Sequence, residues 1–200
     1  MSERSKALLV GLVLGDGYLS KPNGKSKKSY LDLKYDEKSL GYLRWIRTEL
    51  SELNPSPIRR KKNYHQYRFY TESREDVGII RKIFYPNGRK IIPRNIRKFL
   101  CNPLTLAIWY QDDGTLDFRD KYHANAMLST YCFTKDECQL LASAMHDIYN
   151  LDVRVCRCVM RGILYFRLYI ASKSMEMFMR LIEPYMHRCF QYKLVKNRIV

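Results

Sequence analysis

Residues 8–17 read LLVGLVLGDG and residues 105–114 read TLAIWYQDDG. Each is an apolar run of about two helical turns that stops at an Asp-Gly pair. A carboxylate in the last turn of a buried helix is disfavoured by the helix dipole and by the loss of water. Because the chain contains this arrangement twice, we expect paired helices that bring Asp16 and Asp113 to one place. A cation bound there would stabilise the two carboxylates.

Each stretch also has a simpler interpretation. Asp-Gly is a common turn dipeptide and many core helices end at glycine, so either stretch alone favours an ordinary helix end. The start of the chain, MSERSKALLVGLVLG, also has the basic beginning and apolar run of a signal peptide. Glu3 and the Asp-Gly-Tyr that follows do not fit such a peptide, and the second stretch lies deep inside the chain. We therefore expect a protein that is not secreted.

The composition is that of a folded protein from a reducing compartment. The chain has 200 residues, 46% hydrophobic and 13% aromatic, which is enough for one core or two small ones. No segment approaches the ~20 apolar residues that span a bilayer, so we expect a soluble protein with no membrane partner. The six cysteines include no C-x-x-C pair, which argues against zinc and favours free thiols. This predicts an intracellular location, in a bacterial or archaeal cytoplasm or an organelle.

The charge balance indicates a nucleic-acid partner. Lysine and arginine number 36 against 20 acidic residues, for a formal net charge of +16. Membrane binders gather their basic residues on amphipathic helices, whereas here they lie in strand-like and loop segments with aromatic residues between them. This pattern is typical of contact with a nucleic-acid backbone along a broad surface. The candidate contacts are Tyr30, Lys34, Arg59, Arg60, Lys61, Arg68, Tyr70, Arg154, Arg157, Tyr165, Arg167 and Tyr169.

The two halves of the chain repeat one order of predicted elements. After the first stretch come a strand, a helix capped by Asp36 or Ser39, two strands and a helix, at residues 29–35, 36–53, 58–62, 67–71 and 72–84. After the second, the same order occupies residues 125–133, 134–147, 153–160, 163–171 and 172–186. Thr134 and Glu137 form a predicted capping box. We infer an internal duplication with its boundary near residues 95–102 and units at residues 1–98 and 99–200.

Alternation along the strands predicts what each face of the sheets does. Around Asp32 and Lys34, and again around Arg167 and Tyr169, apolar side chains alternate with polar, basic or aromatic ones. Each sheet should therefore have one apolar face under helices and one basic, aromatic face. Two such sheets could line a groove for DNA, because a two-stranded ribbon fits the major groove and can contact base edges there.

Taken together, these residues resemble the LAGLIDADG homing endonucleases, in the single-chain, two-motif form of the intron-encoded branch. Residues 9–17 resemble the first signature, and residues 106–114 resemble the second in its W-x-x-DDG form. The K-x-I-P segment at Lys90 and the Y-K-L segment at Lys193 extend the likeness over nearly the whole chain. The resemblance implies an α/β (α+β) fold of tandem αββαββα units about a pseudo-twofold axis. The motif helices would pair on this axis, and two saddle-shaped antiparallel sheets would straddle the DNA.

The resemblance also implies an activity. A monomer would hydrolyse phosphodiester bonds of double-stranded DNA at a long asymmetric target and leave short 3′ overhangs, the reaction behind intron homing. The implied cofactor is Mg²⁺, which prefers oxygen ligands, with Mn²⁺ as a substitute and Ca²⁺ supporting binding only. Asp16 and Asp113 are the implied catalytic metal ligands, joined by the backbone carbonyls of Gly15 and Asp112.

Two lysines are the remaining catalytic candidates. Lys90 and Lys193 occupy matching places after the last helix of each unit, and they follow Asp16 and Asp113 by 74 and 80 residues. The resemblance places a basic active-site residue at both positions, where it would orient the attacking water and stabilise charge on one scissile phosphate. The simpler interpretation of either lysine is a solvated charge that steers phosphate.

Other functions stay open on the sequence alone. An intron maturase would bind structured intron RNA to assist splicing, without or in addition to DNA cleavage. A DNA-binding regulator on a degenerate scaffold is expected to lose one or both acids, and both are present here. A nicking-only enzyme would keep them. The chain departs from the family pattern at Ile108, which stands where the first motif has Gly11, so close helix packing must rest on Gly11, Gly15 and Ala107.

Overall fold

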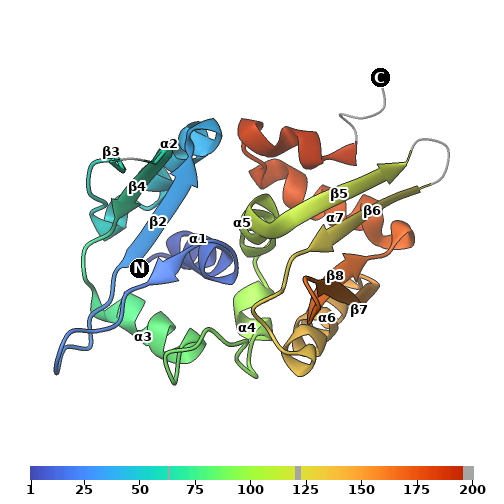
Figure 1. The fold of residues 1–200 in the computed structure, drawn as a ribbon, viewed down its shortest axis with the longest axis horizontal. Helices are drawn as coiled ribbons and strands as arrows, with labels where there is room; N and C mark the ends of the chain where they lie inside the picture. Colours follow the sequence, from blue (N-terminus) through green and yellow to red (C-terminus); the bar gives the residue numbers. More distant parts are fainter. Residues whose placement is uncertain (63, 120–122, 196–200) are drawn as a thin grey trace.

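The computed structural model describes residues 1–62, 64–119 and 123–195 and has two similar halves (Figure 1). The first half contains α1 (Glu3–Leu14), β1 (Tyr18–Leu19), β2 (Leu31–Asp36), α2 (Leu40–Glu49), β3 (Arg59–Arg60), β4 (Gln66–Tyr70) and α3 (Glu75–Phe84). The second contains α4 (Arg97–Leu100), α5 (Pro103–Asp113), β5 (Gly114–Arg119), β6 (His123–Leu128), α6 (Lys135–Tyr149), β7 (Val153–Met160), β8 (Ile163–Ile170) and α7 (Met175–Ile182). Short 3₁₀ segments accompany them: η1 (Glu37–Ser39), η2 (Ser51–Leu53), η3 (Ser172–Ser174), η4 (Glu183–Tyr185) and η5 (Arg188–Lys193).

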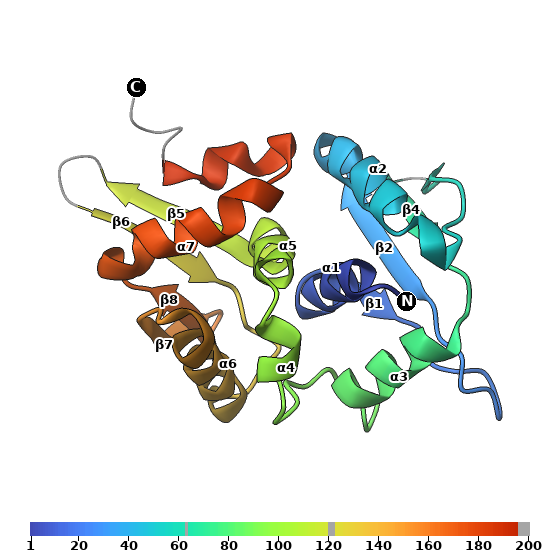
Figure 2. The same cartoon turned by 180° about the vertical axis from the view of Figure 1, so that it is seen from behind.

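Each half builds a four-stranded antiparallel sheet with the same topology. The strand orders are β1-β2-β4-β3 and β5-β6-β8-β7, so corresponding strands occupy corresponding places. Seen from behind, α2 lies over the first sheet and α6 and α7 lie over the second (Figure 2). This confirms the predicted α/β fold of two repeated units with antiparallel sheets.

The helices α1 and α5, which contain the two motifs, pack against each other at the centre of the molecule (Figure 1). Both helices are buried on all sides over most of their length. Their sequences therefore have no polar stripe of the kind that a surface helix has. The two backbones approach closely. A Cβ atom added at Gly11 would come within 2.7 Å of the Ile108 side chain, and one at Gly15 within 2.6 Å of Asp112. The predicted close packing at Gly11 and Gly15 is therefore confirmed, and Ile108 fits because it faces a glycine.

Local capping signals start the central helices and α6. The Ser2 side chain caps α1, and Asn102 caps α5, where Pro103 takes the first helical position that tolerates a missing N–H. Thr134 and Glu137 form the predicted capping box of α6. These ends depend on neighbours in sequence, so they could be predicted without tertiary information.

Two of the predicted strands are shorter than expected. The strand expected at residues 58–62 is limited to Arg59–Arg60. Pro57, which has no N–H to donate, precedes it, and beyond it the Lys61 N–H donates to the Gln66 carbonyl as the chain turns. The strand expected at residues 125–133 ends at Leu128. Beyond it the chain turns, and the Thr130 hydroxyl donates a hydrogen bond to a backbone carbonyl of β8 at 2.9 Å.

The other differences concern segments whose structure depends on a partner strand or turn. The polar stretches after both motifs contain β1 and β5, which are strands because they pair with β2 and β6. The helix expected at residues 72–84 begins only at Glu75, since Arg74 is bridged to Ser29 in an extended conformation. Of the two predicted caps for residues 36–53, Asp36 is the one whose side chain accepts a hydrogen bond, at the start of η1. The last helix, expected at residues 172–186, is split into η3, α7 and η4.

The apolar core is continuous across both halves. Buried side chains from both sheets and both motif helices form one cluster, with Trp109 and Phe69 among its largest members. The division predicted between residues 98 and 99 falls inside α4. Within the described ranges, no helix is both long and apolar enough to cross a bilayer. All six cysteines are free thiols.

Candidate active site

The paired helices place two acids side by side at the end of the central helix pair. Asp16 follows Gly15, the C-cap of α1, and Asp113 is the last residue of α5. Burial raises the pKa of Asp113 to about 7, and the negative charge of Asp16 adds to the shift. Burial also raises the pKa of Asp16. The two carboxylates therefore lie in one region at the end of the helix pair, as the duplicated motif predicts, with Asp113 half-buried and Asp16 still exposed to solvent.

The two candidate lysines reach the same region from the far ends of their units. Their charges oppose the rise in pKa at both Asp16 and Asp113, so all four groups lie within electrostatic reach of one another. Lys90 Nζ donates to the Gly15 carbonyl at 2.9 Å, and Lys193 Nζ donates to the Gln111 carbonyl at 2.7 Å. Each ammonium thus neutralises carbonyls at the C-terminal end of a motif helix, where the helix dipole is negative.

Burial has the opposite effect on the lysines, because it disfavours their charged form. It lowers the pKa of Lys193 to about 8 and also lowers the pKa of Lys90, while the surrounding acids oppose both shifts. Lys193 is only 7% exposed. A buried ammonium with a lowered pKa is suited to moving or holding a proton near neutral pH. This environment differs from the solvated position that a steering charge would occupy.

A third acid joins this cluster, and only the tertiary structure reveals its contacts. The Asp112 carboxylate accepts a hydrogen bond from the Tyr35 hydroxyl at 2.7 Å and one from the Asp16 backbone N–H at 3.2 Å. Burial and the charge of Asp16 hold the pKa of Asp112 well above the ordinary carboxyl range. Asp112 therefore links the end of α5 to the acid that follows α1. The sequence interpretation assigned a role only to its backbone carbonyl, although the double Asp of the second motif was a visible signal.

The donor set suits a hard divalent cation that the substrate helps to bind. Among the residues that the structure describes, no three or more His, Cys, Asp and Glu side chains form a group that could hold a metal by themselves. Asp16 and Asp113 offer carboxylate oxygens, which Mg²⁺ prefers. Their pKa values are raised, so a cation bound between them would stabilise the ionised form of both. The Gly15 carbonyl already accepts from Lys90, with one lone pair remaining.

The first sheet has a polar face on which basic residues lie in a row. The strand register sets Lys34 opposite Arg68, and Arg68 opposite Arg59, so the three side chains share one face. Arg68 makes a bidentate pair with Asp32, with N···O distances of 2.7 and 2.9 Å. Tyr30 and Tyr70 extend the same surface, with ring centroids 6.0 Å apart.

The second sheet has a matching face, with one difference from the prediction. Arg154 lies opposite Tyr169, Cys156 opposite Arg167 and Cys158 opposite Tyr165, so these residues share a side. The same register places Arg157 opposite Phe166, on the side toward the helices. Arg157 is therefore not part of the predicted basic face, because side chains of consecutive strand residues point in opposite directions.

The first sheet requires a similar correction. Arg60 lies opposite Tyr67 and thus on the side toward α2, away from Arg59. Lys61 lies past the end of β3, where its backbone N–H bonds to Gln66 and its ammonium lies 4.2 Å from the Tyr64 ring centroid. Sequence composition grouped these three neighbours together, whereas the pleat of the strand separates them.

Comparisons with known proteins match these features. A family model described as the LAGLIDADG DNA endonuclease family matches residues 6–178, which include both motifs. The cytochrome b mRNA maturase bI2 of Saccharomyces cerevisiae is 25% identical over 94% of this chain and 46% of its own length. A probable intron-encoded endonuclease 1 of Wickerhamomyces canadensis is 27% identical over 98% of this chain and 86% of its own length. The chain thus spans about half of the first relative and most of the second.

Solved structures show the same fold. The homing endonuclease I-WcaI bound to its DNA recognition sequence matches with a TM-score of 0.82 and 25% identity, over 97% of this chain and 87% of that one. A variant of I-DmoI in complex with its target DNA and Mn matches with a TM-score of 0.58 and 14% identity, over 89% of this chain and 92% of that one. With its two motif helices, its repeated sheets and the match of the family model, this chain belongs to the LAGLIDADG DNA endonuclease family.

Proposed function

We propose that this protein is a site-specific endonuclease that cuts both strands of a long asymmetric DNA target and leaves short 3′ overhangs. The observation behind the proposal is the convergence of Asp16 and Asp113 at the ends of paired helices, between two sheets with basic faces. One chain supplies both halves of this site, so we infer a monomer. Its six free cysteines fit a reducing intracellular compartment.

A divalent cation is the proposed cofactor, with Mg²⁺ favoured, Mn²⁺ as a substitute and Ca²⁺ supporting binding only. When bound it supplies Lewis acidity, which activates the attacking water and neutralises the leaving 3′ oxygen. Ionised Asp16 and Asp113 would hold it, together with the carbonyls of Gly15 and Asp112. I-DmoI was solved with its target DNA in the presence of Mn and of Mg, which supports the use of such ions in this fold.

The protein's own groups have distinct tasks in this proposal. Lys90 and Lys193 each orient one attacking water and stabilise charge on one scissile phosphate. Asp112 holds the Asp16 backbone in place through its hydrogen bond. The row formed by Lys34, Arg59 and Arg68, with its counterparts Arg154 and Arg167, binds the duplex in register with the acids.

Cleavage of a randomised duplex library tests the proposal. In Mg²⁺ the protein should select one long site and cut both strands with a fixed stagger, and sequencing of the cut ends gives both positions. Chelation of the metal with EDTA should abolish cutting, and Asp16→Asn should do so without loss of binding, because Asn keeps the shape and loses the charge. Site selection with full cutting by Asp16→Asn would contradict the assignment of the acids.

A second function is favoured by two relatives. Cytochrome b mRNA maturases of Saccharomyces cerevisiae and Debaryomyces hansenii are 25% and 27% identical to this chain. We therefore keep RNA splicing assistance as an alternative or additional activity, with intron RNA as the partner. Strong binding to folded intron RNA, with weak and salt-insensitive binding to duplex DNA, would favour the maturase function over the nuclease.

A further inference from the structure

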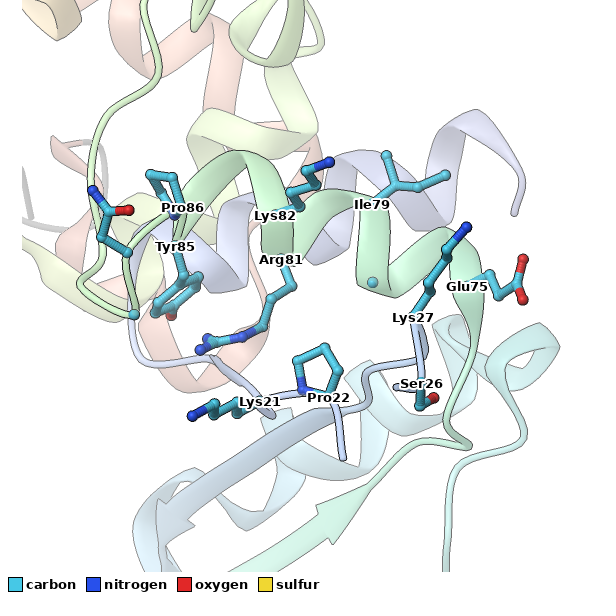
Figure 3. Close-up of a pocket in the computed structure, with 13 residues that line it drawn as sticks. Lys21, Pro22, Ser26, Lys27, Glu75, Ile79, Arg81, Lys82, Tyr85 and Pro86 are labelled. Atoms are coloured by element: carbon cyan, nitrogen blue, oxygen red, sulfur yellow. The ribbon is translucent and has the colours of Figure 1, made fainter. Parts of the chain in front are cut away.

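A cleft of about 830 Å³ lies between α3 and the loop that joins β1 to β2 (Figure 3). Four cations and one acid line it: Lys21, Lys27, Arg81, Lys82 and Glu75. The endonuclease proposal uses none of them. A concave site with an excess of one charge concentrates ligands of the opposite charge. The cleft should therefore attract anions.

Arg81 contributes a buried positive charge to this cleft. The residue is 7% exposed, and within the described ranges no carboxylate forms a salt bridge with it. One of its five N–H groups donates to the Leu19 carbonyl at 2.8 Å, and its guanidinium lies 4.3 Å from the Tyr85 ring centroid. Figure 3 shows the side chain pointing from α3 toward Lys21 and Pro22 on the facing loop. A buried cation without an acidic partner is costly, so an anionic ligand would be stabilised here.

The rest of the cleft lining is mixed, with the apolar Ile79 and the polar Ser26 and Asn87. Tyr85, Pro22 and Pro86 surround the end near Lys21, and Glu75 lies at the opposite end (Figure 3). Phosphate is the anion that a guanidinium binds best. The Tyr85 ring is 7% exposed and already faces Arg81, so Pro22 and Pro86 are the accessible apolar surfaces that a base or sugar could contact. A nucleotide suits both features and is small enough for a cleft of this volume.

We propose that the cleft binds one nucleotide unit, with its phosphate on Arg81, Lys21 and Lys27 and its base or sugar against Pro22 and Pro86. The same chemistry has two sources, a free nucleotide and a nucleotide within a nucleic-acid strand. Residues 86–88 of the cleft wall lead directly to Lys90, whose ammonium bonds to Gly15 in the active site. This continuity favours a strand that passes from the active site into the cleft.

Titrations followed by amide NMR of the full chain test this proposal. The probes are adenosine 5′-monophosphate, the dinucleotide d(ApA), whose only phosphate is a diester, and uncharged adenosine. The signals of Gly78 and Gly88, which line the cleft, should shift saturably with either phosphate-bearing probe. Adenosine should bind at least about tenfold more weakly, because it lacks the charged group. Binding of d(ApA) identifies a strand as the source, and binding of the monophosphate alone identifies a free nucleotide.

A matched pair of loop variants separates the cleft from general electrostatics. Lys21→Gln with Lys27→Gln removes two cleft cations and should weaken binding about three- to tenfold. Lys25→Gln with Lys28→Gln removes the same charge from the same exposed loop but does not alter the cleft lining, so affinity should stay within about twofold. The proposal is overturned if no probe shifts Gly78 and Gly88, or if both pairs weaken binding equally. Cleavage is not measured, so this failure would leave the endonuclease proposal untouched.

Discussion

Replacing Asp113 with Asn should abolish double-strand cleavage and, at the same time, stabilise the metal-free protein at pH 8. Burial and the charge of Asp16 raise the pKa of Asp113 from 3.8 to about 7. The folded protein therefore holds this proton more tightly than the unfolded chain does. For a carboxyl group shifted in this direction, the free energy of unfolding falls as the pH rises between those two values. Asn at this position cannot ionise, so the variant avoids that loss.

The structure sets the size of the effect. A shift of about three pKa units corresponds to at most ~4 kcal/mol at 1.36 kcal/mol per unit. Asp113 retains some contact with solvent, and part of the rise in its pKa comes from the charge of Asp16. We therefore expect a smaller gain, of about 1–3 kcal/mol, in the free energy of unfolding. For a chain of this length that gain corresponds to a rise in Tm of about 2–10 °C.

Thermal unfolding in EDTA at pH 5 and pH 8, followed by circular dichroism, measures this gain. The advantage of Asp113→Asn should be largest at pH 8 and smaller at pH 5, where the wild-type carboxyl is mostly protonated. Added Mg²⁺ should raise the Tm of the wild type at pH 8 but not that of the variant. Asp117→Asn, which removes an acid paired with Arg119 on the same strand, is the control and should change Tm little. A variant that is less stable than wild type at pH 8 would refute this reasoning.

Three further predictions concern the lysines, the third acid and the strand faces. Lys90→Met and Lys193→Met should each slow the cleavage of one DNA strand about 10²–10⁴-fold at saturating DNA and the other strand less, so that nicked circles accumulate. Normal cleavage rates at saturation would show that both lysines only steer phosphate. Tyr35→Phe removes a hydrogen bond to Asp112 and should slow cleavage about tenfold with unchanged Kd; a normal single-turnover rate would contradict a positioning role for Tyr35. Arg59→Gln and Arg154→Gln should each reduce the salt dependence of DNA affinity by about 0.9 in log–log slope. Arg60→Gln and Arg157→Gln, on the opposite sides of their strands, should leave that slope unchanged.

Patterns within short stretches of the sequence predicted much of the fold. The two motifs, the capping box at Thr134 and the hairpin from Val153 to Ile170 depend on residues close together in sequence, so their signals are readable without a structure. The repeat of these elements predicted two similar sheets around a central helix pair, and the structure has them. The sequence also predicted close packing at Gly11 and Gly15, whereas the contact of Gly11 with Ile108 became visible only in the structure.

Contacts between distant segments required the tertiary structure. Tyr35 and Asp112 are 77 residues apart, and no local pattern predicts that one hydroxyl would hold the acid beside Asp16. The sides taken by Arg60 and Arg157 depend on strand register, which is set by the partner strand, and a basic run contains no information about that partner. The cleft at Arg81 exists because α3 packs beside a loop that lies more than forty residues earlier. Residue identities along the chain show which groups are capable of chemistry, and the packing of the two halves sets which of them meet, because burial, charge and hydrogen bonding act through space and not along the chain.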